Sequence, residues 1–339
     1  MAVRNHTSNQ IKPIVIIAIL GTLLLLLAVI SMNVGKMNLS PSEVIQVLIG
    51  KGTPKQNLTV FDFRLPRITL AILVGIGMSL SGAILQSLLK NDLASPGTLG
   101  ISSGSGLSVM LYITLFAVNG AFSPFMLPLL AFAGGIAAAV IIFLLAYRKG
   151  REISHTGLIL TGVAVGTGYG AITLLMTLQL DKKQYDFALR WSAGSLWGDN
   201  WNYISILAPW IIVIGFYVFY KSRALNTLSL GNQTAAGLGL AIRKEFIGLT
   251  LAAVALSSGS VALGGNFFFV GMISPHIARR LVGSNHKFML PVAGLVGALI
   301  ILLADTITRT ISLGADIPTG VIITILVTPY FLYLLAKAN

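Results

Sequence analysis

The stretch from Ile68 to Leu89 constrains the fold more than any other part of this chain, because it contains no charged side chain. An α-helix rises about 1.5 Å per residue and the apolar core of a bilayer is about 30 Å thick, so this stretch can cross a membrane as one helix. Apolar runs of similar length recur along the chain, which is 55% hydrophobic and only 10% charged. Soluble domains carry about 25% charged residues, and membrane barrels use short alternating strands. The sequence therefore predicts an all-α polytopic membrane protein.

We expect about ten membrane-spanning helices in a single transmembrane domain over residues 1–339. Ser40, followed by Pro41, is typical of a helix N-terminus and predicts a short amphipathic helix at the membrane surface. Residues 67–82 and 244–259 both start with a basic residue and end in Ser-Gly after a largely apolar run. This likeness leaves open an inverted repeat that relates spans 2–5 to spans 7–10, or a chance match between helices rich in small residues. The expected spans are residues 14–32, 68–89, 94–117, 125–147, 156–178, 203–220, 245–263, 267–277, 288–307 and 317–335.

The basic residues indicate how the chain is oriented. If the N-terminus is cytoplasmic and ten spans alternate, a majority of the 23 Lys and Arg residues fall on the cytoplasmic side, and both termini are cytoplasmic. The net charge of +13 then reflects short loops between spans, and we expect no nucleic-acid partner.

The sequence lacks the residue patterns that several kinds of chemistry require. The chain has no cysteine and no G-x-x-x-x-G-K-[S/T] segment to cradle nucleotide phosphates. His276 and His286 lack a nearby third metal ligand. We therefore expect no metal site, no cofactor, and no ATPase or other enzymatic activity in this chain.

A set of short motifs follows one another in a distinctive order: Arg64-Leu65-Pro66-Arg67, Ser81-Gly82, Gln86, Asn91, Leu93-Ala94-Ser95-Pro96, Leu99-Gly100 and the stretch Gly271 to Arg279. With these motifs the chain resembles the FecCD-type permease subunits of ATP-binding cassette importers for iron-siderophores, haem and cobalamin, over nearly its whole length. The resemblance implies a multi-pass permease of the bacterial inner (cytoplasmic) membrane. Its implied partners are a second permease subunit, identical or paralogous, two ATP-binding ATPase subunits and an extracytoplasmic substrate-binding protein.

Three arginines lie at the expected outer ends of spans. Arg64, Arg67 and Arg309 have a plain interpretation as interface anchors whose charged heads reach the lipid headgroups. The resemblance implies instead that they pair with glutamates on the substrate-binding protein. The planar guanidinium suits that role, because it can bind a carboxylate through two parallel hydrogen bonds.

Residues 225–243 form the longest cytoplasmic segment, and we expect two short helices that meet in a bend at Gly231. On its residues alone this segment is an ordinary amphipathic surface helix. The resemblance implies a coupling segment that docks into a cleft of the ATPase subunit, with Asn232 at a position where relatives often carry an acid. The implied coupling residues are Leu228, Leu230, Gly231, Asn232, Ala235, Gly237, Leu238 and Gly239.

Small polar residues suggest a gate and a pathway. The resemblance assigns Ser154, His155 and Thr156 to a cytoplasmic gate, although a lone loop histidine is more often simply solvated. Candidate pathway residues are Ser81, Gln86, Ser102 and Ser103. Asp305 is the acid that lies well within an apolar span, and Arg309, one helical turn further on, is its expected partner.

The resemblance implies a permease that moves iron(III)-siderophore complexes inward by alternating access, driven by separate ATPase subunits. A cobalamin or haem permease of the same family is the first alternative. An ion-coupled secondary transporter is a second, from a different class, but the scarcity of acids within the spans argues against it.

Overall fold

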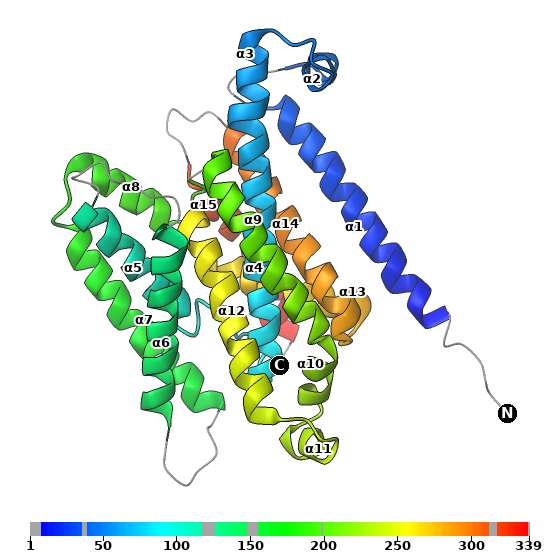
Figure 1. Ribbon diagram of the computed structural model, residues 1–339, viewed down its shortest axis with the longest axis vertical. Helices are drawn as coiled ribbons and strands as arrows, with labels where there is room; N and C mark the ends of the chain where they lie inside the picture. Colours follow the sequence, from blue (N-terminus) through cyan, green and yellow to red (C-terminus); the bar gives the residue numbers. More distant parts are fainter. Residues whose placement is uncertain are drawn as a thin grey trace.

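The computed structural model describes residues 8–35, 39–116, 126–147, 155–197, 199–311 and 317–337, and these ranges form a bundle of long helices (Figure 1). Seven helical stretches are long and apolar enough to cross a membrane, and two shorter apolar helices and α13 complete a set of ten in the described part of the chain. The prediction of about ten spans is confirmed. The ten are α1 (Ser8–Asn33), α4 (Leu65–Leu89), α5 (Ile101–Phe116), α6 (Met126–Ala146), α7 (His155–Thr177), α9 (Trp201–Tyr220), α12 (Ile242–Gly264), α13 (Phe268–Val282), α14 (His286–Thr310) and α15 (Thr319–Lys337).

Short helices complete the described chain. The surface helix expected after Ser40 is α2 (Pro41–Leu48), and Ser40 and Glu43 cap each other's backbone N–H groups as a capping box. Helix α3 (Pro54–Asn57) and the π-helical segment η1 (Leu58–Arg64) run directly into α4, so this helix extends well beyond the expected span. The remaining short helices are α8 (Lys182–Ser192), α10 (Ser222–Ser229) and α11 (Asn232–Gly237).

The third span begins later than expected. We expected a helix from residue 94, but α5 starts at Ile101. Ser95 and Thr98 hydrogen-bond to each other's backbone N–H groups, and Gly100 has a φ of +70°. Such side-chain bonds compete with helical ones, and the positive φ interrupts any helix, so residues 90–100 form turns.

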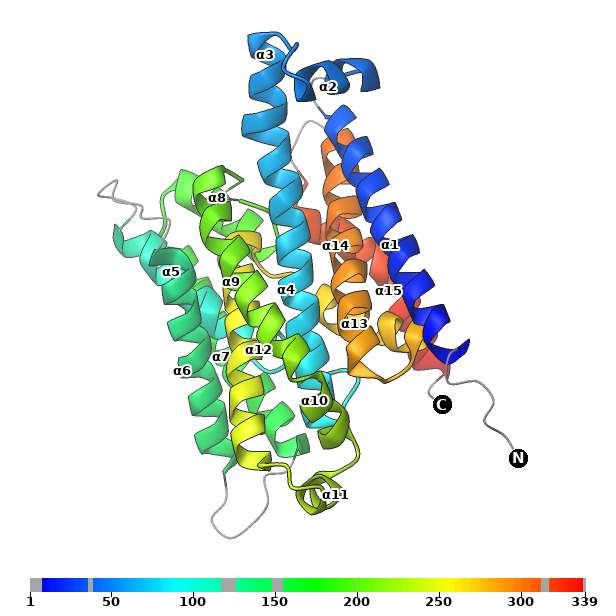
Figure 2. The same cartoon turned by 45° about the vertical axis from the view of Figure 1, so that its right-hand side comes forward.

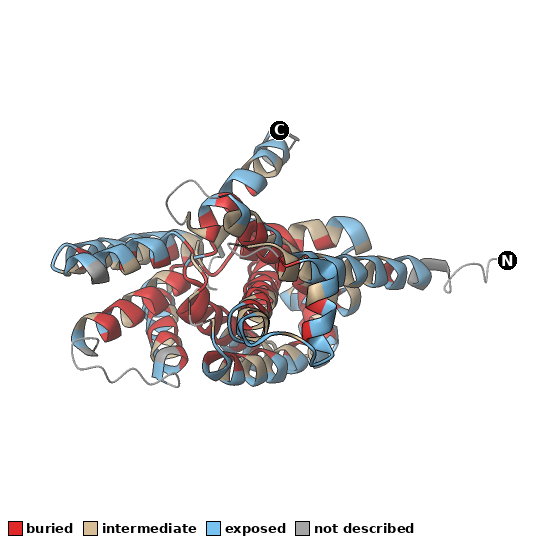
Figure 3. Ribbon diagram, turned by 90° about the horizontal axis from the view of Figure 1, so that it is seen from above, coloured by how far each residue is buried: buried red, intermediate tan, exposed pale blue. Residues whose placement is uncertain are grey.

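Helix α4 lies at the centre of the bundle and packs against α9, α12, α13 and α14. In the apolar window of the α3–α4 stretch 83% of residues are buried, against 6% in α1 at the edge. Figure 3 shows buried residues concentrated at the centre and exposed residues on the outward faces of the peripheral helices. A Cβ at Gly75 would come within 2.6 Å of Ala298 Cα on α14, so glycine allows these two backbones to touch.

Helices α4 and α12 run side by side in opposite directions (Figures 1 and 2). The Ser81 hydroxyl of α4 donates to the carbonyl of Ala253 on α12 at 2.6 Å. Opposite directions are what an inverted repeat requires of these two helices, and the repeat itself remains a prediction. Helices α2 and α3 lie at one end of the bundle, and helices α10 and α11 lie at the opposite end (Figure 2).

Candidate functional site

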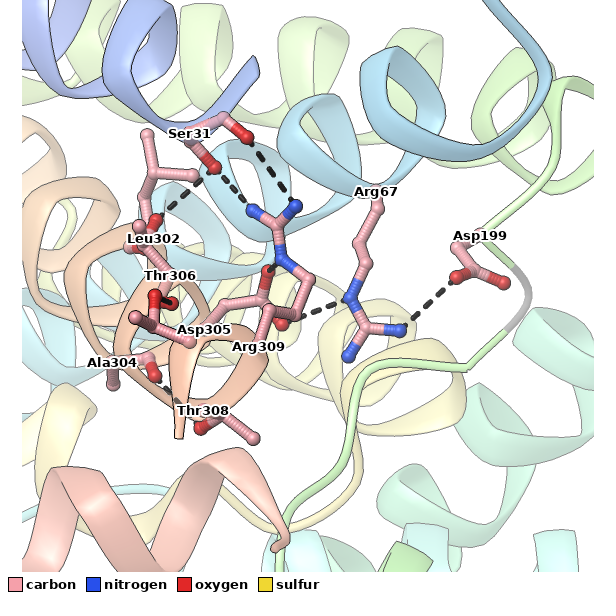
Figure 4. A network of polar contacts seen from close by, with 10 residues as sticks. Ser31, Arg67, Asp199, Leu302, Ala304, Asp305, Thr306, Thr308 and Arg309 are labelled. Carbon is pink, nitrogen blue, oxygen red and sulfur yellow. Dashed lines mark hydrogen bonds and ion pairs between the residues drawn. The ribbon is translucent and has the colours of Figure 1, made fainter. Parts of the chain in front are cut away.

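A network of charges lies at the α3 end of the bundle, and its centre is the buried carboxylate of Asp305 on α14 (Figure 4). Arg67 on α4 places Nε 2.9 Å from Asp305 Oδ1. Arg309, one turn further along α14, places Nε 2.9 Å from Asp305 Oδ2. The expected pairing of Arg309 with Asp305 is confirmed. One carboxylate thus fixes two guanidinium groups from two helices, which satisfies a buried charge that would otherwise be costly.

The network continues outward on both sides. Arg67 also binds Asp199, in the loop before α9, with its second nitrogen 3.2 Å from Oδ2, and the Asp199 side chain is 40% exposed. Arg309 binds the backbone carbonyl and the hydroxyl of Ser31 on α1. The arginines thereby hold α1, α4, α14 and the loop before α9 together.

The three predicted docking arginines differ in exposure. The side chains of Arg67 and Arg309 are 24% and 15% exposed, so both are largely buried but still reach solvent in part. Arg64 is buried and donates to the carbonyl of Met32 at the end of α1. The helical extension of α4 turns this side chain toward α1, and the docking role of Arg64 stays a prediction.

The predicted coupling segment folds as expected. Helices α10 and α11 meet at Gly231, which has a φ of +111°, a value that glycine adopts without strain. Leu228 and Ala235 are buried against the bundle, whereas Leu230 and Leu238 are 64% and 66% exposed. Two large apolar side chains therefore project from the end of the molecule. Asn232, Gly237 and Gly239 lie exposed around them.

An ion pair closes the base of this segment. Lys221, just after α9, binds Glu245 in the first turn of α12 at 2.7 Å. The hydrogen bond to Glu245 raises the pKa of the Lys221 ammonium above its ordinary value. The coupling segment, residues 225–243, lies between Lys221 and Glu245 in the sequence. The ion pair therefore fixes the segment's two ends to each other.

The predicted gate is only partly described. Ser154 lies outside the described residues, and His155 is the first residue of α7. Thr156 is exposed and lies beside Lys90, Asn91 and Asp92, around a hollow at the inner ends of α4 and α7. The gate remains a prediction.

The pathway residues divide into two pairs. Ser81 and Gln86 are buried inside the bundle, where Ser81 binds α12 and Gln86 donates to the Met272 carbonyl of α13 at 2.8 Å. Both residues join helices in this structure, and their role in the pathway stays a prediction. Ser102 is buried without a hydrogen-bond partner among the described residues, and Ser103 is half-buried on the same helix. Their role in the pathway likewise stays a prediction.

Within the described ranges no group of three His, Asp or Glu side chains is placed to hold a metal ion. The charged clusters there include the arginine network around Asp305 at the α3 end and the contacts of Arg279 with Asp92 and Gln86. The sequence analysis missed Asp199 and Ser31, because nothing in their local sequence marks them as partners of distant arginines.

Comparison with known proteins places this arrangement in context. Residues 23–337 match the model of the FecCD transport family. The iron(3+)-hydroxamate import system permease protein FhuG of Bacillus subtilis is 44% identical over 332 residues, covering 97% of this chain and 98% of the relative. The hemin transport system permease protein HmuU of Yersinia pestis is 34% identical and covers 97% of this chain and 98% of its own. A solved metal-chelate type ABC transporter in an inward-facing conformation has a TM-score of 0.79 at 30% identity, over 96% of this chain and 99% of that one.

Proposed function

Because this chain belongs to the FecCD transport family, we propose that it is the permease subunit of an ATP-binding cassette importer and that it carries iron(III)-siderophore complexes inward. The observation that supports this cargo is the 44% identity to a ferric-hydroxamate permease along almost the whole of both chains. A haem permease is the second candidate, supported by the 34% identity to the hemin relative.

In this proposal the chain performs no bond chemistry. Two copies, or this chain and a paralogue, enclose the pathway between them, and two separate ATPase subunits bind at the α10–α11 end. Exposed Leu230 and Leu238 supply the apolar contact there, since large exposed apolar side chains commonly mark an interface. That end is cytoplasmic, and α1 begins and α15 ends toward it, so both termini are cytoplasmic (Figure 2).

The substrate-binding protein docks at the opposite end. The accessible parts of Arg67 and Arg309 face it and bind its acidic side chains. Exposed ion pairs add little affinity one by one, so their main effects are orientation and encounter rate. The exposed apolar faces of α1, α7 and α9 contact the lipid tails of the membrane.

Uptake of radioactive iron in iron-starved cells tests this function. Cells lacking the gene are supplied with iron on a panel of hydroxamate, catecholate and citrate chelators, and with haem in a parallel arm. We expect the deletion to abolish uptake of one chelate class and the intact gene to restore it. The Arg67→Glu and Arg309→Glu double variant should not restore it, whereas Lys55→Glu, an exposed basic residue at the same end, should. Loss of haem uptake alone would identify the second candidate, and unchanged uptake of every source would refute the proposed cargo.

A further inference from the structure

His286, the first residue of α14, lies buried where three helices meet near the coupling segment. Its ring Nε2 is 2.6 Å from the Ser87 hydroxyl on α4, and its Nδ1 is 2.7 Å from Oδ1 of Asn226 on α10. The backbone N–H of His286 donates to the same Asn226 oxygen at 2.9 Å. These contacts join α10 to both α4 and α14.

The hydrogen-bond roles in this cluster follow from its geometry. Because Asn226 Oδ1 accepts the backbone N–H of His286, the ring nitrogen Nδ1 that faces it must carry a proton. In a neutral ring Nε2 is then the acceptor, and the single proton of the Ser87 hydroxyl has two acceptors within reach, Nε2 at 2.6 Å and the Ala83 carbonyl at 2.8 Å. The amide nitrogen of Asn226 donates to Asn285, the N-cap residue of α14, at 3.1 Å. Both polar atoms of the Asn226 side chain are therefore bound to the start of α14.

Helices α4 and α14 are joined along their whole shared length. At the outer end Arg67 binds Asp305, in the middle Gly75 lies against the Ala298 backbone, and at the inner end Ser87 binds His286. Polar contacts at both ends and backbone contact between them resist sliding and rotation of one helix against the other. We call α4 and α14 together the strut.

The coupling segment is attached to the strut on one side only. Leu225 and Leu228 of α10 are buried against the bundle, and Asn226 lies between them in sequence. In α11 only Ala235 is buried, and Leu230 and Leu238 are exposed on either side of it. A force applied to the exposed tip therefore reaches the strut through α10, and it also reaches α12, which follows α11 in the chain and contacts it.

We propose that the strut transmits movement between the coupling segment and the outer arginine network, and that Asn226 and His286 are the positioning residues that fix α10 to it. The proposal rests on the proposed function, since it needs an ATPase at the inner end and a binding protein at the outer end. The proposal adds the path between the ATPase and the binding protein. Movement of α11 displaces α10, then α4 and α14 together, and thereby displaces Arg67 and Arg309. An energetic connection of this kind is reciprocal, so docking at the arginines must in turn change ATP hydrolysis.

The test uses the complete transporter, reconstituted in lipid vesicles with its ATPase and binding protein. Uptake per ATP hydrolysed and stimulation of hydrolysis by the binding protein are measured for each variant. Asn226→Ala should leave assembly and unstimulated hydrolysis in place but lower uptake per ATP about fivefold or more, the size of a typical coupling between sites. Asn226→Asp keeps the oxygen that accepts from His286 and should retain most of the coupling. Thr227→Ala is the matched control, because that hydroxyl binds only within α10, to the Arg223 carbonyl.

Three outcomes would overturn the proposal. Asn226→Ala could keep the normal ratio of uptake to hydrolysis, which would mean that this contact transmits nothing. Asn226→Asp could lose as much coupling as Asn226→Ala, or Asn226→Ala could fail to assemble, which would make the contact purely structural. Failure of the proposed function is distinct, because the unaltered transporter would then show no ATP-driven uptake at all.

Discussion

Arg67 on α4 and Asp305 on α14 lie far apart in the sequence, yet Arg67 Nε is 2.9 Å from Asp305 Oδ1. The other oxygen of the same carboxylate binds Arg309. The buried acid therefore holds two basic side chains of the α3 end at a fixed spacing.

Removing the charge of Asp305 should be strongly destabilising. Asp305→Asn leaves two arginines without their shared counter-charge, and breaking a buried ion pair from one side costs about 3–5 kcal/mol. The free energy of unfolding in detergent measures this effect. Asp199→Asn is the control, since its pair is partly exposed and should cost at most about 1 kcal/mol. Equal losses in the two variants would show that Asp305 is not the centre of the network.

Asp199 should compete with the binding protein for Arg67. Asp199 Oδ2 lies 3.2 Å from a terminal guanidinium nitrogen of Arg67. An acidic side chain of the binding protein must therefore displace Asp199 to bind that nitrogen. Asp199→Asn should therefore tighten binding of the binding protein, measured as its Kd at low salt. Asp62→Asn also removes one negative charge from the same end, at an exposed residue, and is therefore the control for the change in net charge. The competition would be disproved by an Asp199→Asn variant that binds no more tightly than Asp62→Asn.

Gly82 should tolerate no side chain. A Cβ there would overlap the backbone of Gly271 on α13, and forcing two packed helices apart costs about 1–3 kcal/mol. The thermal unfolding of Gly82→Ala measures the cost. Gly168→Ala on α7 is the matched control, because nothing lies within 4 Å of the added carbon and alanine favours a helix by about 0.5–1 kcal/mol. A Gly82→Ala protein as stable as the control would contradict the packing described here.

Strongly alkaline pH should weaken the attachment of the coupling segment. The pKa of Lys221 is raised by its hydrogen bond to Glu245, so the stabilising contribution is fully present below the unfolded value of 10.5 and is lost as the pH rises through the higher folded value. In Lys221→Met the alkaline loss of stability should be smaller, as measured by unfolding at neutral and at strongly alkaline pH. Lys244→Met, at an exposed neighbour, should behave like the unaltered protein. An identical alkaline loss in Lys221→Met would exclude this pair as its source.

Local patterns were enough to predict much of this fold. Long uncharged runs predicted the ten long helices, Ser40 before Pro41 predicted α2, and Gly231 predicted the bend between α10 and α11. The pair Asp305 and Arg309 was predictable because one helical turn separates them. Each of these features depends on residues that are close together in the sequence.

Features that depend on packing between distant segments were not predictable. The contact of Asn226 with His286 and the contact of Arg67 with Asp305 exist only because α10, α4 and α14 converge in space. Ser81 and Gln86 resembled pathway residues because buried and pathway positions both favour small or polar side chains in membrane helices. The structure places both residues inside the bundle, where each joins two helices.

In the proposed function, ATP hydrolysis by a separate subunit drives an iron chelate through this chain. Its most direct test is uptake of radioactive ferric hydroxamate by lipid vesicles that contain this permease, its ATPase subunits and the binding protein. We expect uptake that requires ATP, stops with vanadate and is absent when the ATPase subunits are left out. Uptake that continues without the ATPase and follows an imposed proton or sodium gradient would contradict the account and identify a secondary transporter instead.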